Sequence, residues 1–161
     1  MYQIEREEWR KDLSRRVQHH GWLYDYKARR VTETMKLGPL PEWAQALAER
    51  LHAERLVPHV ADQVIVNEYI RKQGISKHVD CVPCFADGIA MISLLESWEM
   101  VFRRGGVTKR LLLEANSIAV LTREARYEWT HEIPSRTKEP SGLRRQRRVS
   151  VTLRKVLLPS H

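Results

Sequence analysis

The sequence predicts a mainly β fold of the α+β class, in which short strands with flanking helices form a two-sheet sandwich or jelly roll. From residue 63 onward, short segments rich in β-branched residues follow one another, separated by Gly, Asp, Asn or clusters of charge. The last segment, residues 147–156, alternates between polar and apolar side chains, as a strand with two different faces does. Clear helical periodicity is confined to the part of the chain before residue 57.

Helices are expected at residues 7–18 and 41–56. In the second of these, apolar residues recur at i, i+4 and i+8 from Trp43, and Pro41 suits an initial helical turn. The end of the first is poorly defined, because a His-His-Gly sequence follows it. We therefore expect one well-formed helix and a shorter one near the N-terminus.

Strands are expected in eight segments, and this density is typical of a sandwich or jelly roll. The stretch 135–146 has no periodicity and carries Pro, Ser and Gly among charged residues, which predicts a mobile loop. The expected strands are residues 21–31, 63–70, 89–95, 98–102, 111–113, 117–122, 126–133 and 147–156.

Length and charge bound the class of protein. A chain of 161 residues predicts one domain over residues 1–161, because chains usually divide only beyond roughly 250 residues. No apolar run approaches the roughly 18 residues that cross a bilayer, and no secretory signal is present, so we expect a cytoplasmic monomer without a membrane partner. The net charge of +8 favours a polyanionic partner such as nucleic acid, although a solvated basic surface explains such a charge equally well.

Cys81 and Cys84 are the only cysteines, and their C-x-x-C spacing can mark a redox site or half of a zinc site. A four-thiolate zinc site needs a second pair, which the chain lacks. We therefore expect both cysteines to remain unpaired thiols.

His78 and Asp80 are candidate metal ligands, because residues i and i+2 of an extended chain project from one face, roughly 7 Å apart along the backbone. The third ligand would be His131, in a segment where Tyr127, Trp129 and His131 share a face of the expected strand. Two histidines and one carboxylate form the facial triad of non-heme iron(II) oxygenases. The same ligands also suit zinc or manganese, so the metal depends on what binds beside it.

A candidate carboxylate site follows in the last segment. An arginine binds a carboxylate through two parallel hydrogen bonds, and neighbouring hydroxyls can complete them. Asn67 and Tyr69 share one face of an earlier strand and can donate to the same ligand. The alternative is an edge strand with a basic face toward solvent. The polar face of residues 147–156 carries Arg148, Ser150, Thr152 and Arg154.

The order and spacing of these residues resemble the AlkB family of oxygenases, whose signature is N-x-Y, H-x-D, a distal His and R-x5-R. The phrases GISKHVD, RYEWTH and RRVSVTLRKV are similar to the branch that contains the tRNA wobble-uridine hydroxylase and its compact bacterial relatives. The similarity runs from about Arg15 to Val156. In this chain the signature reads Asn67-Glu68-Tyr69, His78-Val79-Asp80, His131 and Arg148 to Arg154.

The resemblance implies a cupin-like double-stranded β-helix with a jelly-roll core at about residues 60–157 and a nucleic-acid-facing segment at about residues 9–40. It implies an enzyme, a 2-oxoglutarate-dependent dioxygenase that uses Fe(II), 2-oxoglutarate and O2. Such enzymes couple the oxidative decarboxylation of 2-oxoglutarate to hydroxylation of a substrate C–H bond. A hydroxylated N-methyl group is then lost as formaldehyde.

The resemblance also implies roles for single residues. Iron would be held by His78, Asp80 and His131. Arg148 would bind the distal carboxylate of 2-oxoglutarate, and Arg154 would steady its metal-proximal end together with Asp80. The residues implied to complete the pocket are Asn67, Tyr69 and Ser150.

The chain departs from the family at four glycine positions. Lys72, Leu95, Arg123 and Glu132 stand where relatives usually have glycine. Glycine often supplies a positive φ, so these residues are expected to strain turns at the rim of the site. The metal and 2-oxoglutarate residues are all present, which favours an active enzyme.

The substrate-binding residues are expected in the N-terminal segment, where cationic and aromatic side chains mix. Such side chains pair with phosphates and stack on a single-stranded or flipped base. The alternative is that its aromatic residues belong to the core of a strand. The basic loop 136–148 is a second candidate for phosphate contact. The predicted substrate-binding residues are Arg15, Arg16, Trp22, Tyr24 and Tyr26.

Four functions are consistent with the sequence. The first is oxidative demethylation of alkylated nucleobases in DNA or RNA, that is, alkylation repair. The second is hydroxylation of a modified tRNA wobble uridine, and the third is a catalytically impaired relative that only binds nucleic acid. The fourth is an oxygenase of proteins or small molecules, against which the positive charge argues mildly.

Overall fold

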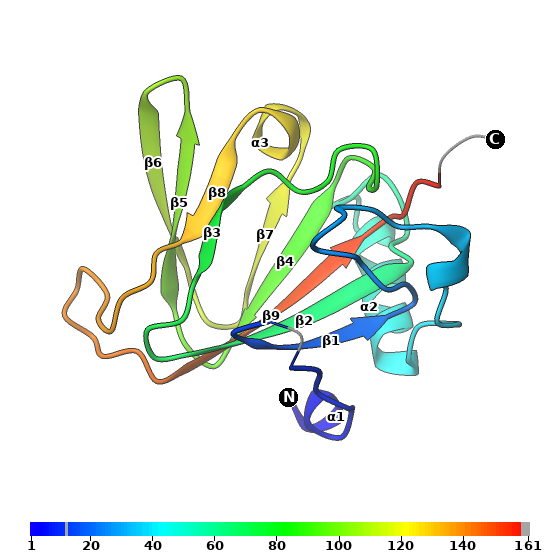
Figure 1. Cartoon of the computed structure of the whole chain (residues 1–161), viewed down its shortest axis with the longest axis horizontal. Coiled ribbons are helices and arrows are strands. Elements are labelled where there is room, and N and C mark those ends of the chain that lie inside the picture. The colour runs from blue at the N-terminus through cyan, green and yellow to red at the C-terminus, as the bar shows by residue number, and fades with distance from the viewer. Residues whose placement is uncertain (12, 159–161) are drawn as a thin grey trace.

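The computed structural model describes residues 1–11 and 13–158, and its main feature is a pair of antiparallel β-sheets that face each other (Figure 1). The larger sheet has the strand order β1-β2-β9-β4-β7, and the smaller one has the order β3-β8-β5-β6. The prediction of a mainly β fold with flanking helices is confirmed.

Successive strands do not simply alternate between the two sheets. In sequence, the hairpin β5–β6 of the smaller sheet lies between β4 and β7, which belong to the larger sheet. The strands are β1 (Arg16–His20), β2 (Gln63–Ile70), β3 (Ile75–His78), β4 (Ile89–Leu94), β5 (Trp98–Arg104), β6 (Val107–Leu113), β7 (Ser117–Leu121), β8 (Thr130–Ile133) and β9 (Arg147–Arg154). The helices are α1 (Tyr2–Glu5), the 3-10 helix η1 (Glu33–Met35), α2 (Glu42–Ala53) and α3 (Arg123–Tyr127).

Strand β9 lies at the centre of the larger sheet and has two different faces. Val149, Val151 and Leu153 are buried on one face and pack in the apolar cluster that includes α2. The intervening polar residues project from the other face, toward the smaller sheet. The register places Asn67 of β2 opposite Ser150, and Ser93 of β4 opposite the same Ser150. Three adjacent strands thus present polar side chains at one level.

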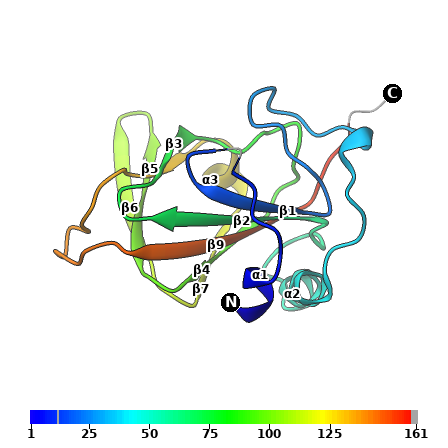
Figure 2. The same cartoon turned by 60° about the horizontal axis from the view of Figure 1, so that its bottom comes forward.

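Helices α1 and α2 cover the outer face of the larger sheet (Figure 2). The predicted helix at 41–56 is confirmed as Glu42–Ala53, and its buried face is Ala44, Ala48 and Leu51. Alanines at this face let the helix backbone approach the sheet closely. None of the helices within the described ranges is long and apolar enough to cross a membrane.

The N-terminal predictions were wrong. Residues 16–18 of the predicted helix 7–18 lie in β1, which pairs with β2. The helix described near the N-terminus is α1, and residue 12 lies outside the described residues. The predicted strand 21–31 is irregular, because Gly21 turns the chain away from the sheet at a φ of +78°. A Cβ on Gly21 would lie 2.0 Å from the Asp62 carbonyl oxygen. Pairing with the open edge of β2 outweighs the weak local preference for helix.

The predicted strand 126–133 is also shorter than expected. Its first residues form helix α3, and the strand begins at Thr130. The prediction that Tyr127 shares a strand face with His131 is therefore wrong, because Tyr127 lies in α3. The stretch 135–146 has no regular strand or helix, as predicted, and Glu139 holds it through ion pairs with Arg136 and Arg145.

The cysteine prediction was wrong, because Cys81 and Cys84 form a disulfide. The Cys84 amide donates to the Cys81 carbonyl oxygen at 3.2 Å, which closes a tight turn. This turn brings the two Cα atoms to 5.2 Å, within the range that a disulfide spans. The residue spacing alone did not reveal the turn.

Two of the four replaced glycines keep a left-handed backbone. Leu95 has a φ of 75° and Arg123 a φ of 50°, whereas Lys72 and Glu132 do not lie in this region. Next to Lys72 it is Arg71, with a φ of 51°, that adopts the left-handed conformation. The expected strain is therefore confined to Leu95 and Arg123 among the four.

Replacing Leu95 or Arg123 with glycine is expected to raise the free energy of unfolding by about 1 kcal/mol, because a left-handed residue with a Cβ is strained by roughly 1–2 kcal/mol. Both side chains are exposed, so little packing is lost. Urea denaturation measures the change. Lys72→Gly is the control and should give no gain; an equal gain in all three variants would mean that backbone strain is not the cause.

Candidate active site

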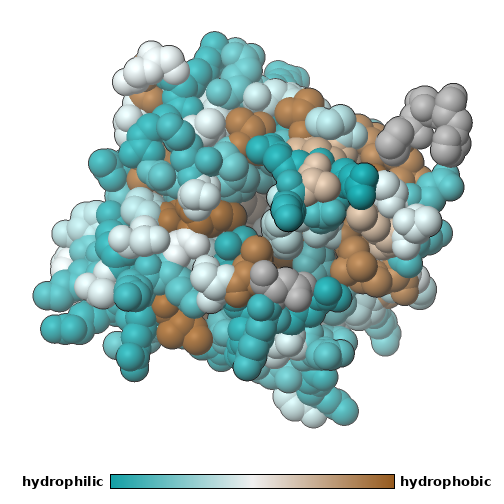
Figure 3. All heavy atoms as spheres, in the orientation of Figure 1, coloured by the Kyte–Doolittle hydropathy of each residue, from teal (hydrophilic) through white to brown (hydrophobic). Residues whose placement is uncertain are grey.

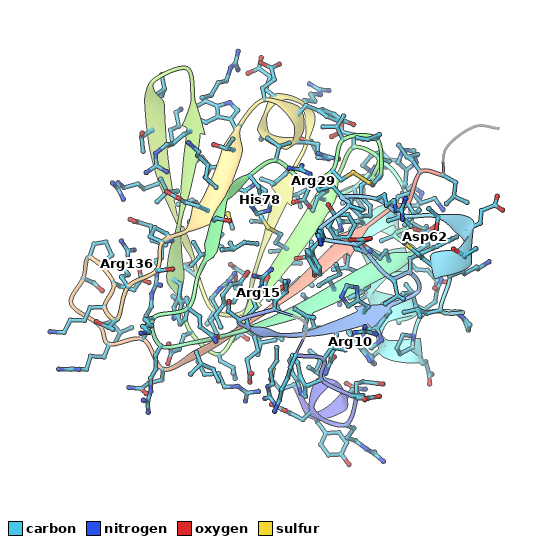
Figure 4. All side chains as sticks on the ribbon, in the orientation of Figure 1. Arg10, Arg15, Arg29, Asp62, His78 and Arg136 are labelled. Carbon is cyan, nitrogen blue, oxygen red and sulfur yellow. A yellow bond between two sulfur atoms is a disulfide. The ribbon has the colours of Figure 1, made fainter. Side chains whose placement is uncertain are left out.

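A pocket of about 300 Å³ opens between the two sheets, and it collects side chains from both of them and from the N-terminal segment. Figure 3 shows that hydrophilic side chains dominate the face that carries it. In Figure 4, Arg15, Arg29 and His78 lie around the space between the sheets, whereas Arg136 lies in the distant loop. The pocket contains every residue that was expected to hold metal or 2-oxoglutarate.

His78, Asp80 and His131 meet at one wall of the pocket. One ligand atom from each lies within 4.8 Å of the others. Their positions follow from the pairing of β3 with β8, which sets His78 opposite His131. Nε2 of His78 lies 3.2 Å from Asp80 Oδ1, and Nε2 of His131 lies 3.7 Å from the same oxygen. Three ligand atoms this close can bind a single metal ion.

The protonation of these groups suits a ligand set. The Ser76 carbonyl oxygen lies 2.7 Å from Nδ1 of His78, so a proton on Nδ1 leaves Nε2 free as a ligand. Burial opposes the charge of Asp80, but contacts with His78 and the charge of Arg154 outweigh it and hold the pKa of this carboxyl well below its usual range. Burial lowers the pKa of His131 to about 4, which leaves its imidazole neutral.

Arg148 and Arg154 are buried guanidinium groups on the pocket floor. Arg148 Nη2 donates to Ser93 Oγ at 2.8 Å, and Arg154 Nη1 donates to Asp80 Oδ2 at 3.0 Å. Nε of Arg148 and Nη2 of Arg154 are buried and find no acceptor among the described residues. A ligand with a carboxylate at each end would supply the missing acceptors, so the pocket fits 2-oxoglutarate.

Asn67, Tyr69 and Ser150 line the pocket between these arginines. Arg15 Nε donates to Asn67 Oδ1 at 2.8 Å, which leaves the amide nitrogen of Asn67 as a donor toward the pocket. The guanidinium groups of Arg15 and Arg148 lie 5.6 and 5.5 Å from the Tyr69 ring centroid. This geometry permits cation–π attraction, which stabilises both arginines beside the ring.

The predicted substrate residues divide into two groups. Arg15, Tyr24 and Tyr26 line the pocket, and the two tyrosine rings meet edge to face at 5.0 Å. Burial raises the pKa of Tyr26 to about 12, so its hydroxyl remains a donor at neutral pH. Arg16 projects from the opposite face of the sheet and binds Glu68, and Trp22 is buried in a separate apolar cluster. These two residues are therefore excluded from the pocket.

Several other residues at the site were not predicted from the sequence. Ser93 holds Arg148, and its alignment with Ser150 follows only from the pairing of β4 with β9. Gln63 Oε1 accepts from Arg154 Nε at 2.8 Å. Arg29 lines the rim and donates to the Val79 carbonyl oxygen at 2.9 Å. A periodic reading of β2 could have found Gln63, because it shares a face with Asn67.

The family follows from comparison with known proteins. The family model described as the 2OG-Fe(II) oxygenase superfamily matches residues 6–154 of the chain. The chain belongs to this superfamily. The match includes the histidine–aspartate–histidine cluster and both buried arginines, and the curated relatives place the chain in the AlkB family, as the signature predicted. The protein is thus a 2-oxoglutarate-dependent dioxygenase by family, with Fe(II), 2-oxoglutarate and O2 as its cofactors.

The AlkB relatives are named either for repair of alkylated DNA or for modification of tRNA. The chain is 35% identical to the alkylated DNA repair protein ALKBH8 homolog of Arabidopsis thaliana over 88% of its length. It is 37% identical to the tRNA (carboxymethyluridine(34)-5-O)-methyltransferase ALKBH8 of Mus musculus over 76% of its length. The chain spans 49% of the first relative and 19% of the second.

Solved structures show the same fold at low sequence identity. OsALKBH1 superposes with a TM-score of 0.65 over 89% of this chain and 78% of its own, at 18% identity. A 2OG-Fe(II) oxygenase from Burkholderia pseudomallei gives the same TM-score over 95% of this chain and 75% of its own, at 15% identity. The jelly-roll prediction is therefore confirmed.

Proposed function

We propose that the protein oxidises alkyl groups on nucleobases in DNA or RNA, with oxidative demethylation as its main reaction. His78, Asp80 and His131 would hold the iron, and Arg148 and Arg154 would bind the two ends of 2-oxoglutarate, with Asn67, Tyr69 and Ser150 around it. When bound, iron and 2-oxoglutarate supply the oxidising power for a C–H bond. The chain's own residues orient the substrate and exclude water.

One observation carries this proposal: a single pocket brings together the metal cluster, the two buried arginines and a rim of aromatic and cationic side chains. Tyr24 and Tyr26 offer ring faces and edges to a base that is single-stranded or flipped out of a duplex. Arg15 and Arg29 lie beside them, where a phosphate or a base oxygen can accept their hydrogen bonds. The net charge of +8 favours a nucleic acid over a neutral small molecule.

Formaldehyde release tests this function. The purified protein, with iron(II) and 2-oxoglutarate, is incubated with single-stranded oligonucleotides that carry 1-methyladenine or 3-methylcytosine, in DNA and in RNA. We expect formaldehyde and the unmodified base in equal amounts. If no modified base is turned over while 2-oxoglutarate is still consumed, demethylation is the wrong reaction.

Hydroxylation of a modified wobble uridine is the second candidate, because the mouse relative is named for a carboxymethyluridine at tRNA position 34. Mass spectrometry of treated tRNA separates the two reactions. Hydroxylation adds one oxygen atom to the nucleoside, whereas demethylation removes a methyl group. A gain of oxygen at position 34 without formaldehyde would favour this second function.

A basic hollow outside the pocket supports a nucleic-acid substrate. It is lined by Arg71, Thr137, Arg144, Arg145 and Gln146. Glu139 neutralises Arg145, but Arg71 and Arg144 are exposed and form no ion pair within the described part of the chain. The turn after β2 also contacts the segment that carries Leu13 and Arg15 of the pocket lining, because Gln73 Nε2 donates to the Ser14 carbonyl oxygen at 2.6 Å. A phosphate backbone can therefore run from the rim to this hollow.

Reversing both free charges, as Arg71→Glu with Arg144→Glu, is expected to weaken binding of an unmodified single-stranded oligonucleotide and to lower its salt dependence. Each lost phosphate contact reduces the slope of log affinity against log salt by about 0.7. Fluorescence anisotropy at several salt concentrations measures both quantities. The control is Arg50→Glu with Arg104→Glu, which changes the net charge by the same amount: Arg50 of α2 is paired with Glu54, and Arg104 with Glu124 and Glu128. Equal losses in both proteins would point to net charge alone.

A further inference from the structure

Arg126 is a buried cation that neither the metal nor the 2-oxoglutarate site uses. Its side chain, 1% exposed, lies in α3 and turns toward the segment that follows the metal-ligand carboxylate. All of its hydrogen bonds go to backbone carbonyl oxygens of residues 80–86. Nη1 donates to Asp80 at 3.0 Å, Nη2 to Cys81 at 3.2 Å and to Phe85 at 2.9 Å, and Nε to Ala86 at 3.4 Å.

Burying a guanidinium group costs free energy, so the groups that it contacts indicate what its charge does in the fold. Burying a charge is unfavourable unless the group is paired and hydrogen-bonded. Among the described residues, Arg126 forms no ion pair, so four carbonyl dipoles and the nearby charge of Asp80 stabilise it instead. An apolar side chain could fill the same volume at lower cost. The charge is needed to gather four carbonyls, which repel one another, around one point.

The segment that Arg126 holds shapes the site in two ways. It begins at Asp80, whose carboxylate lies between the two histidines. It then carries Phe85, whose ring centroid lies 3.9 Å from the guanidinium carbon of Arg154. Elsewhere it is tied by the Cys81–Cys84 disulfide and by the Ala86 amide, which donates to the Lys155 carbonyl oxygen. Arg126 is the group that fixes the backbone of Asp80 itself.

We propose that Arg126 is a positioning residue that holds the turn of residues 80–86 so that the Asp80 carboxylate faces the two histidines, and that it thereby sets the metal affinity of the site. This inference rests on the proposed iron site. Arg126 does not line the pocket and donates to the backbone carbonyl oxygen of Asp80, so it acts only through the backbone. Outer-shell groups of this kind typically change metal affinity by about 10- to 100-fold.

Arg126→Lys tests the proposal, because lysine keeps the charge but cannot reach four carbonyls at once. Arg145→Lys is a matched control: Arg145 is 2% exposed and also donates to backbone carbonyls, those of Pro134 and Arg136, but in the loop far from the metal. Both variants lose a buried arginine clamp and should be destabilised alike. Only the first should change the metal site.

Cobalt(II) serves as the probe, because its visible absorption reports the ligand geometry and its binding requires no turnover. We expect Arg126→Lys to bind cobalt(II) about 10-fold more weakly than the wild-type chain, with an altered spectrum, and Arg145→Lys to bind it normally. Thermal unfolding of the metal-free proteins measures the stability of each variant. Wild-type affinity and spectrum in a folded Arg126→Lys protein would overturn the proposal.

A second variant decides the question if Arg126 variants do not fold. The Tyr127 ring lies 4.8 Å from the Arg126 guanidinium carbon and is 40% exposed, so Tyr127→Ala loosens Arg126 without removing it. Weaker cobalt(II) binding supports the proposal, and unchanged binding contradicts it. If even the wild-type chain binds no cobalt(II), or if His78→Ala binds it equally well, the iron site itself fails rather than the role of Arg126.

Discussion

A chain in which His78 is replaced by alanine is expected to convert 2-oxoglutarate to succinate at less than about 1% of the wild-type rate. The reason is that Nε2 of His78 is one of three ligand atoms that lie within 4.8 Å of one another, and two ligands hold iron(II) poorly. The variant should still fold, because His78 ends β3 and its side chain is 26% exposed. Succinate is measured by mass spectrometry with iron(II), with and without a methylated oligonucleotide.

The matched control for this loss is His59→Ala, since His59 is exposed and lies outside the pocket. It should retain wild-type activity and the same requirement for iron. Succinate formation by His78→Ala above a tenth of the wild-type rate, at saturating iron, would show that His78 is not a ligand. No succinate from the folded, iron-loaded wild-type chain would favour a protein that only binds nucleic acid.

Arg148→Lys is expected to raise the 2-oxoglutarate concentration for half-maximal rate by about 100-fold, with a much smaller effect on iron affinity. Lysine keeps the charge but loses the planar fork, and each charged hydrogen bond contributes about 1.5–3 kcal/mol. A loss of about 2.8 kcal/mol corresponds to a factor of 100. Steady-state kinetics at varied 2-oxoglutarate measure the change, and cobalt(II) binding checks the metal site.

Arg147→Lys is the control for this variant, because Arg147 is adjacent in sequence but projects from the opposite face of β9 toward Glu68 and Glu5. It should leave the dependence on 2-oxoglutarate unchanged. An unchanged half-saturating concentration in Arg148→Lys would mean that another group binds the distal carboxylate. Equal effects of the two substitutions would point to a general disturbance of β9.

Site residues could be predicted from the sequence where the pattern that marks them involves residues close together in the chain. Strict alternation along β9 separated Arg148 and Arg154 from the apolar residues between them, and the structure places both arginines in the pocket. The triplet His78-Val79-Asp80 needed only an extended chain to bring its two ligands together. Most strands of the jelly roll were likewise visible as β-branched segments between turn residues. Each of these features depends on residues that are near one another in the chain.

Features that depend on distant pairing could not be predicted where no family signature marks them, as it does for His131. Arg15 and Arg16 are equivalent in the sequence, but β1 pairs with β2 so that Arg16 stands opposite Glu68 on the outer face. A shift of one residue would have exchanged the two arginines. The partners of Arg126 are as much as 46 residues away, and no periodicity marks them. The same reason explains the missed disulfide, which requires a turn that tertiary contacts stabilise.

The central place of β9 has a consequence for how the chain reaches its native state. β9 is the last of the strands in the described residues, but it joins the pair β1–β2 to the pair β4–β7. Until residues 147–154 are available, β2 and β4 each keep one unpaired edge, and such edges invite association with other chains. The larger sheet therefore closes late, by contacts between distant parts of the chain, which is the slow kind of folding. The strand that brings Arg148 and Arg154 into the pocket therefore also covers the strand edges through which the unfinished sheet could aggregate.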